Sequence, residues 1–113
     1  MRDGYDIETR AVDMLASAIC HHVREEECEL TMRQTAVLLT VRYHPDAVCS
    51  IAKSLNVSDA AASRAIDALQ KHQLVKRARL QENRNRVIVS ITPRGQALVG
   101  RLLEGVPELA AMA

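Results

Sequence analysis

The chain has 113 residues, of which 48% are apolar, and its formal net charge at pH 7 is +1. This length and apolar content predict one compact domain, and its core must be aliphatic because the chain has no Phe or Trp. No apolar run approaches the ~20 residues of a membrane-spanning helix, and the polar start differs from a secretory signal. Three cysteines at irregular spacing indicate reduced thiols and a cytoplasmic location.

The charge is unevenly distributed along the chain. Residues 1–46 carry five Lys and Arg against nine Asp and Glu, whereas residues 71–101 carry eight against one, a balance of +7. Such a segment can hold phosphates while the acidic part of the chain stays away from them. The alternative interpretation is a solvated basic surface, which is what most charge runs are.

The N-terminal part predicts two helices. Apolar residues at helical spacing indicate a long helix over residues 7–27, and its acidic end opposes the helix dipole, so we expect fraying there. Thr31 and Gln34 then match a capping box, in which each side chain accepts from the other residue's backbone N–H. The helix that they open should run to about Arg42 and stop before Pro45, because a residue that precedes proline leaves the helical region.

Residues 48–72 have the pattern of a helix-turn-helix, with helices over 49–55 and 58–72. Asn56 tolerates the left-handed conformation that the tight turn needs, and Ser58 is a favourable N-cap for the second helix. Ala52 is small enough for two helix backbones to approach closely. The apolar residues expected between the helices are Ile51, Leu55, Val57, Ala62 and Ala65.

A β-hairpin and a closing helix follow. Residues 75–79 and 86–91 predict two strands joined by a polar loop, since apolar residues alternate along the second one. Thr92 and Pro93 are a cap and a first helical residue, and they open a helix over 93–104 that Gly105 and Pro107 end. The fold class is therefore mainly α with a small β-hairpin, a winged helix-turn-helix whose wing covers residues 75–91.

The sequence resembles the MarR-type transcriptional regulators over residues 29–103, about two thirds of the chain. The segments that carry the resemblance are 30–34 (LTMRQ), 50–58 (SIAKSLNVS), 62–69 (ASRAIDAL), 74–77 (LVKR) and 87–95 (VIVSITPRG). The resemblance implies a homodimer, joined through its N- and C-terminal helices, that binds double-stranded DNA with one recognition helix per half-site. No membrane partner is expected, and the sequence does not identify a small-molecule effector.

Three departures from the family pattern accompany the resemblance. Gln73 stands where such proteins usually have a glycine with positive φ, at a cost of roughly 1 kcal/mol. Asn83, Arg84 and Asn85 replace the usual Asp-x-Arg element of the wing tip. Because the chain stops about twenty residues after Thr92, we expect a smaller or differently built dimer interface.

The expected DNA contacts lie on the second helix and on the wing. The helix at 58–72 would enter the major groove, with Arg64 placed for a guanine or a phosphate, unless Arg64 pairs with Asp67 at i+3. Asp67 is expected to orient a nearby arginine rather than to read a base. The wing at 80–86 would reach the minor groove through Arg84 and Arg86. The residues expected at base edges are Ser58, Asp59, Ala60, Ala61 and Ser63, and those expected at phosphates are Lys53, Lys76, Arg77 and Arg79.

Other kinds of site are less favoured. Cys20, His21, His22 and Cys28 superficially resemble a metal cluster, but Cys20 and Cys28 lie ~12 Å apart along one straight helix. Cys20 and Cys49 sit in largely apolar stretches, where buried and inert thiols are expected, although a redox-responsive regulator is a further possibility. No catalytic constellation or cofactor motif is present, which predicts a protein that is not an enzyme. The alternative function is a winged-helix module that docks another protein through its acidic N-terminal helix, with little direct DNA binding.

Overall fold

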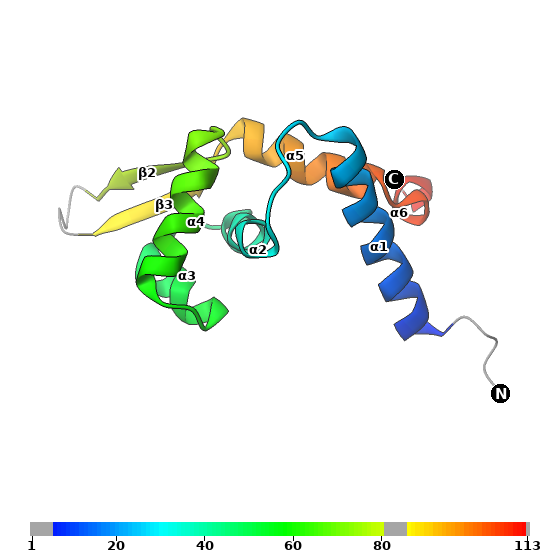
Figure 1. Cartoon of the computed structure of the whole chain (residues 1–113), viewed down its shortest axis with the longest axis horizontal. Helices are drawn as coiled ribbons and strands as arrows, with labels where there is room; N and C mark the ends of the chain where they lie inside the picture. The colour runs from blue at the N-terminus through cyan, green and yellow to red at the C-terminus, as the bar shows by residue number, and fades with distance from the viewer. Residues whose placement is uncertain (1–5, 81–85, 113) are drawn as a thin grey trace. The chain divides into compact units, whose positions relative to one another are not determined.

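The computed structural model describes residues 6–80 and 86–112, which fall into two compact units (Figure 1). A terminal unit comprises residues 1–29 and 99–113, and a central unit comprises residues 30–98. The terminal unit contains α1 (Ile7–Glu25) and α6 (Pro107–Met112). Helix α5 (Pro93–Glu104) contributes its first part to the central unit and its second part to the terminal unit. The remaining elements of the central unit are α2 (Met32–Val41), β1 (Asp46–Ala47), α3 (Val48–Leu55), α4 (Asp59–Lys71), β2 (Val75–Arg79) and β3 (Val87–Ile91).

The central unit is built around the predicted helix-turn-helix. Helices α2 and α3 both pack against α4, and the predicted contact residues Ile51, Ala62 and Ala65 are buried, as is the small residue Ala52. The Ser58 hydroxyl accepts a hydrogen bond from the Ala61 N–H at 3.0 Å, which confirms the predicted N-cap of α4. The largest side chains of this core are aliphatic: Val37, Leu38, Val41, Ile51, Ile66, Leu69, Val75 and Val89.

Within residues 6–80 and 86–112, two residues other than glycine adopt positive φ, and both positions were expected from the sequence. Asn56 has φ 55° at the turn between α3 and α4, and Gln73 has φ 63° just after α4. The carbonyl of Gln73 accepts a hydrogen bond from the Thr92 hydroxyl at 2.7 Å, and the Gly95 N–H donates to the same hydroxyl at 3.0 Å. The left-handed residue after α4 is thus tied to the start of α5, where Thr92 caps the helix as predicted.

The wing forms part of a three-stranded antiparallel sheet with the order β1-β3-β2. The predicted hairpin is confirmed, with Val75 opposite Ile91 and Arg79 opposite Val87 (Figure 1). Strand β1 was not predicted, since a two-residue strand leaves no alternating pattern in the sequence. It pairs Ala47 with Ile88, so β3 lies between two partners and its central residue Val89 is fully buried.

The predicted boundaries of the first two helices shift by one or two residues. Helix α1 ends at Glu25 rather than at residue 27, in line with the expected fraying at the acidic end. Helix α2 ends at Val41, and the predicted capping box of Thr31 and Gln34 is present at its start. Differences of this size are normal at helix ends.

The terminal unit is held by polar and close-packed contacts between α1 and the C-terminal segment. Arg101 and Glu26 form an ion pair, and a Cβ at Gly105 would lie 2.4 Å from the His21 Cβ, so only glycine allows this approach. Helix α6 was not predicted, because Gly105 and Pro107 were interpreted only as the end of α5. No helix in the described ranges is both long and apolar enough to cross a membrane.

Candidate nucleic-acid interface

The leading turn of α4 presents an exposed surface. Ser58, Asp59, Ala60 and Arg64 are exposed, and Ser63 is half-buried. The prediction for Ala61 needs correction, because this residue is buried, with only 8% of its surface exposed. Ala60 is therefore the alanine of this turn that can offer a methyl group to a base, which leaves Arg64 and the polar residues as the main candidates for direct readout.

Arg64 lies beside the start of α2 rather than in an ion pair with Asp67. Arg64 forms no ion pair within the described ranges. The Asp67 carboxylate is instead bound by Arg77, whose Nη1 lies 2.8 Å from Asp67 Oδ1. Arg64 instead lines a shallow hollow between α4 and the capped end of α2. The other residues of the hollow are Thr31, Arg33, Gln34, Ala61 and Ala65. Two arginines, Arg33 and Arg64, thus line the same hollow.

Arg77 extends from β2 to α4. Its Nη1 donates to Gln70 Oε1 at 2.7 Å, and its Nη2 donates to Ser63 Oγ at 3.2 Å and to Ser63 O at 3.3 Å. The Arg77 side chain is only 24% exposed. The prediction that Asp67 orients a nearby arginine is confirmed, with Arg77 as that arginine.

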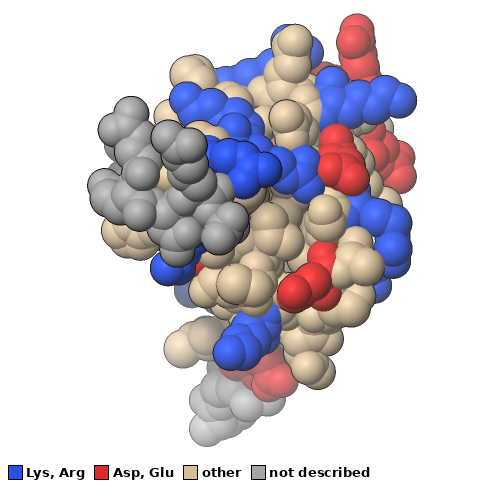
Figure 2. Space-filling view, turned by 90° about the vertical axis from the view of Figure 1, so that its left-hand side faces the viewer, with Lys and Arg blue, Asp and Glu red and all other residues tan. Residues whose placement is uncertain are grey.

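The other basic residues of this region remain accessible. Lys53 on α3, Lys76 and Arg79 on β2, and Arg86 just before β3 are exposed, whereas Arg84 lies outside the described residues. Figure 2 views the molecule from the side of the wing, and several Lys and Arg side chains lie in the upper half of this view among uncharged residues, with acidic side chains mainly toward the right. Cationic side chains on the wing strands and on α3 can contact phosphates on either side of a groove.

The cysteines differ from their prediction. Cys20 and Cys49 are exposed and Cys28 is half-buried, so the expected buried thiols are not found. Cys20 lies on α1 and Cys49 at the start of α3, and an apolar neighbouring sequence does not imply burial because only one face of a helix packs against the core. Among the described residues, no group of three or more His, Cys, Asp or Glu side chains is placed to hold a metal ion.

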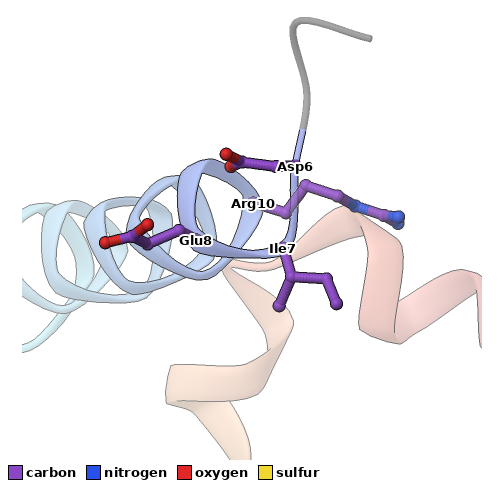
Figure 3. Close-up of a pocket in the computed structure, with 4 residues that line it drawn as sticks. All are labelled: Asp6, Ile7, Glu8 and Arg10. Atoms are coloured by element: carbon purple, nitrogen blue, oxygen red, sulfur yellow. The ribbon is translucent and has the colours of Figure 1, made fainter. Parts of the chain in front are cut away.

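A second hollow, at the start of α1, has no comparable arrangement of charges. Its described lining residues are Asp6, Ile7, Glu8 and Arg10 (Figure 3). Asp6 is the N-cap, and the Thr9 N–H that donates to its carboxylate at 2.8 Å lowers the pKa of that group. In Figure 3 the charged ends of Glu8 and Arg10 point away from one another, so these groups do not converge on a ligand.

Two residues of the candidate interface were not found from the sequence. Arg33 was placed only within a capping box, and Gln70 was not singled out at all. Their positions depend on how α2 and β2 pack against α4, and no local pattern in the sequence reports that packing. A search for polar residues spaced by one or two turns along α4 would have identified Gln70 beside Ser63 and Asp67.

Comparisons with known proteins place the chain in one family. The MarR family model matches residues 30–87, which is more than half of the chain. The chain is similar in structure to the transcriptional regulator Tm0710 from Thermotoga maritima, with a TM-score of 0.80 and 14% identity over 94% of this chain and 73% of that one. It is also similar to Rv1404 from Mycobacterium tuberculosis, with a TM-score of 0.76 and 22% identity over 99% and 80% of the two chains.

A third similar structure is the transcriptional regulator BldR from Sulfolobus solfataricus, with a TM-score of 0.63 and 25% identity over 84% of this chain and 68% of that one. No curated protein sequence matches the chain significantly. The structural matches agree on the winged-helix fold, and the family model covers the helix-turn-helix together with most of the wing. The chain belongs to the MarR family of winged helix-turn-helix transcriptional regulators.

Proposed function

We propose that this regulator binds specific sequences of double-stranded DNA as a homodimer and represses transcription by occluding a promoter. Membership of the MarR family implies a DNA-binding regulator and not an enzyme. The observation that carries the finer proposal is the surface of α4, where Arg64 is exposed and Asp67 is occupied by another arginine. An unpaired guanidinium on the leading half of a recognition helix is the group best suited to a bidentate contact with guanine.

The residues around α4 divide into two roles in this proposal. Ser58, Asp59, Ala60 and Ser63 join Arg64 at the base edges of the major groove, where sequence is read. The exposed cations of α3 and of the wing contact phosphates, and these contacts set the register without specifying a sequence. The phosphate contacts are Lys53, Lys76 and Arg79, whereas Arg86, together with Arg84 outside the described residues, would enter the minor groove.

The dimer of the proposal is joined through an apolar stripe on α1. Val12, Leu15, Ile19 and Val23 are 61%, 59%, 44% and 53% exposed, and their spacing of three or four residues places them on one face of the helix. The opposite face carries the half-buried residues Ser17 and His21, which lie next to Gly105 within the terminal unit. A contiguous apolar face of this kind is typical of a surface that another chain covers. On α5, Leu103 is 52% exposed and would extend the interface.

A titration of the purified protein against a random pool of DNA duplexes, at two salt concentrations, tests the DNA-binding part of the proposal. Because each neutralised phosphate releases counterions, the affinity should fall steeply as the salt rises. Sequencing of the retained duplexes should recover a two-fold symmetric site, as expected for one recognition helix per half-site. If no duplex is retained at low salt, the protein does not act by binding DNA.

The exposed stripe on α1 also favours a second candidate function. A partner protein with an apolar helix could cover Val12, Leu15, Ile19 and Val23 in place of a second copy of this chain, and the protein would then be a docking module. Sedimentation of the free protein separates the two possibilities. A dimer at micromolar concentration supports the homodimeric regulator, whereas a monomer that binds no duplex supports the docking module.

A further inference from the structure

Arg77 joins the wing to the recognition helix through a single guanidinium group. Nη1 lies 2.8 Å from Asp67 Oδ1 and 2.7 Å from Gln70 Oε1, while Nη2 reaches Ser63 Oγ and Ser63 O at 3.2 and 3.3 Å. Three residues of α4 are thereby bound from one residue of β2. The spacing of Ser63, Asp67 and Gln70, four and then three residues, places them in one row along the helix.

The fork shape of arginine is what makes this arrangement possible. Guanidinium presents its donors in a fixed plane, so one group can bind a carboxylate and neighbouring acceptors together. Both terminal nitrogens of Arg77 are already engaged, its charge faces the Asp67 carboxylate, and the side chain is 24% exposed. Only the remaining N–H groups of Arg77 are open to a phosphate, because Nη1 and Nη2 already bind α4, which sets it apart from the exposed Lys76 on the same strand.

The strand that carries Arg77 is itself firmly placed. Arg77 is opposite Val89 of β3, and Val89 is fully buried at the centre of the three-stranded sheet. Its neighbour Val75 at the start of β2 is also buried, at 2% exposure. The guanidinium therefore connects two elements with different tasks, the helix that would read the major groove and the strand that leads to the wing tip.

We propose that Arg77 is a positioning residue for sequence recognition: it sets the distance and angle between α4 and the wing, so that both engage DNA together, and it contacts no phosphate itself. The proposal rests on the DNA-binding function proposed above. In the structure the Asp67 carboxylate pairs with Arg77 through Oδ1 and not with Arg64. A misplaced wing would lower the affinity for the preferred site more than the affinity for other duplexes, because non-specific binding depends on charge rather than on register.

The test compares R77A, R77K and D67N with the matched control K76A, which removes an exposed cation from the same strand. Affinities are measured at several salt concentrations for the duplex that the wild type selects from a random pool and for a scrambled duplex of equal length. We expect R77A and D67N each to reduce the preference for the selected duplex about tenfold while the salt dependence stays unchanged. The control should show the reverse: a salt slope lower by about 1 and a retained preference.

The remaining variants separate positioning from a simple charge contact. R77K keeps the charge without the fork, so it should fail to restore the preference, and the double variant D67A/R77A should lose no more than R77A alone. A lower salt slope in R77A, with near-normal binding by R77K and D67N, would show that Arg77 contacts a phosphate and would overturn the proposal. If R77A does not fold, D67N decides the matter, because it retains the shape of the aspartate.

A failure of the DNA-binding function itself gives a different result. In that case the wild type retains no duplex, and hydrogen exchange of the free protein takes the place of the binding assay. Faster exchange of the β2 and β3 amides in R77A and D67N, with K76A unchanged, supports the role of Arg77 in holding the wing to α4. Unchanged exchange in all three variants overturns it.

Discussion

Arg101 and Glu26 form a two-point ion pair within the terminal unit, with Nε 2.5 Å from Oε2 and Nη2 3.0 Å from Oε1. The Glu26 side chain is 11% exposed and that of Arg101 is 42% exposed. The hydrogen bonds from Arg101, more than the coulombic attraction, lower the pKa of Glu26 below its ordinary value of 4.5. The pair connects Glu26, at the end of α1, to Arg101 on α5 through side chains.

This pair predicts a pH-dependent contribution to stability. Because the folded state lowers the pKa of Glu26, the contribution is complete well above pH 4.5 and is lost as the pH falls through the lower pKa of the folded state. We expect E26Q to reduce the free energy of unfolding at pH 7 by about 1 kcal/mol, a value limited by the exposure of Arg101. Urea unfolding of both proteins from pH 7 to pH 3 measures the difference, which should shrink toward acid. A difference that is constant over this range would contradict the prediction.

Replacing either of two glycines in α5 by alanine should change the stability, in opposite directions. Gly100 is exposed in the helix, and a Cβ added there meets nothing within 4 Å, so G100A should stabilise the protein by about 0.5–1 kcal/mol. A Cβ at Gly95 would lie 2.2 Å from the Leu74 carbonyl oxygen, so G95A should destabilise it by about 2 kcal/mol or more. Thermal unfolding of the two variants beside the wild type checks both signs. A gain in stability from G95A would show that the backbone can move away at little cost.

Substitutions of Arg64 and of Lys76 should weaken DNA binding in two distinguishable ways. R64A should abolish the preference among duplexes, because it removes the side chain best placed for a bidentate base contact. K76A should weaken binding to all duplexes alike, since a phosphate contact carries no sequence information. Selection from a random duplex pool, followed by affinity measurements on the selected and scrambled sequences, provides the comparison. An equal loss of preference in both variants would rule out this division of roles.

The apolar stripe on α1 predicts the site of dimerisation. I19E places a charge at the centre of the stripe, where Ile19 is 44% exposed, so it should convert the dimer into a monomer without unfolding the chain. R24E is the matched control, because Arg24 is exposed on the same helix but lies off the stripe. Sedimentation velocity at micromolar concentration should give a monomer for I19E and a dimer for R24E. A dimer in both variants would place the interface elsewhere.

Most of the fold could be predicted from the sequence because its signals are local. The capping box of Thr31 and Gln34, the N-cap at Ser58 and the left-handed turn at Asn56 each depend on residues at most four positions apart. The strand Val75–Arg79 was predicted with its observed bounds. Backbone conformation at such places is decided by side-chain shape and nearby hydrogen-bonding groups, which a linear pattern contains.

The candidate interface was only partly predictable, because its pairing depends on which segments pack together. Asp67 has one arginine three positions earlier on its own helix and another ten positions later on a strand. Only the tertiary structure shows that Asp67 forms its ion pair with the second of these, Arg77. In the same way the packing of α4 buries Ala61, and the pairing of β1 with β3 extends the predicted hairpin. The sequence by itself determined the helices, the wing strands and the turns, whose energies are local. The tertiary structure decided which charges are neutralised and which remain exposed, because those contacts join residues far apart in the chain.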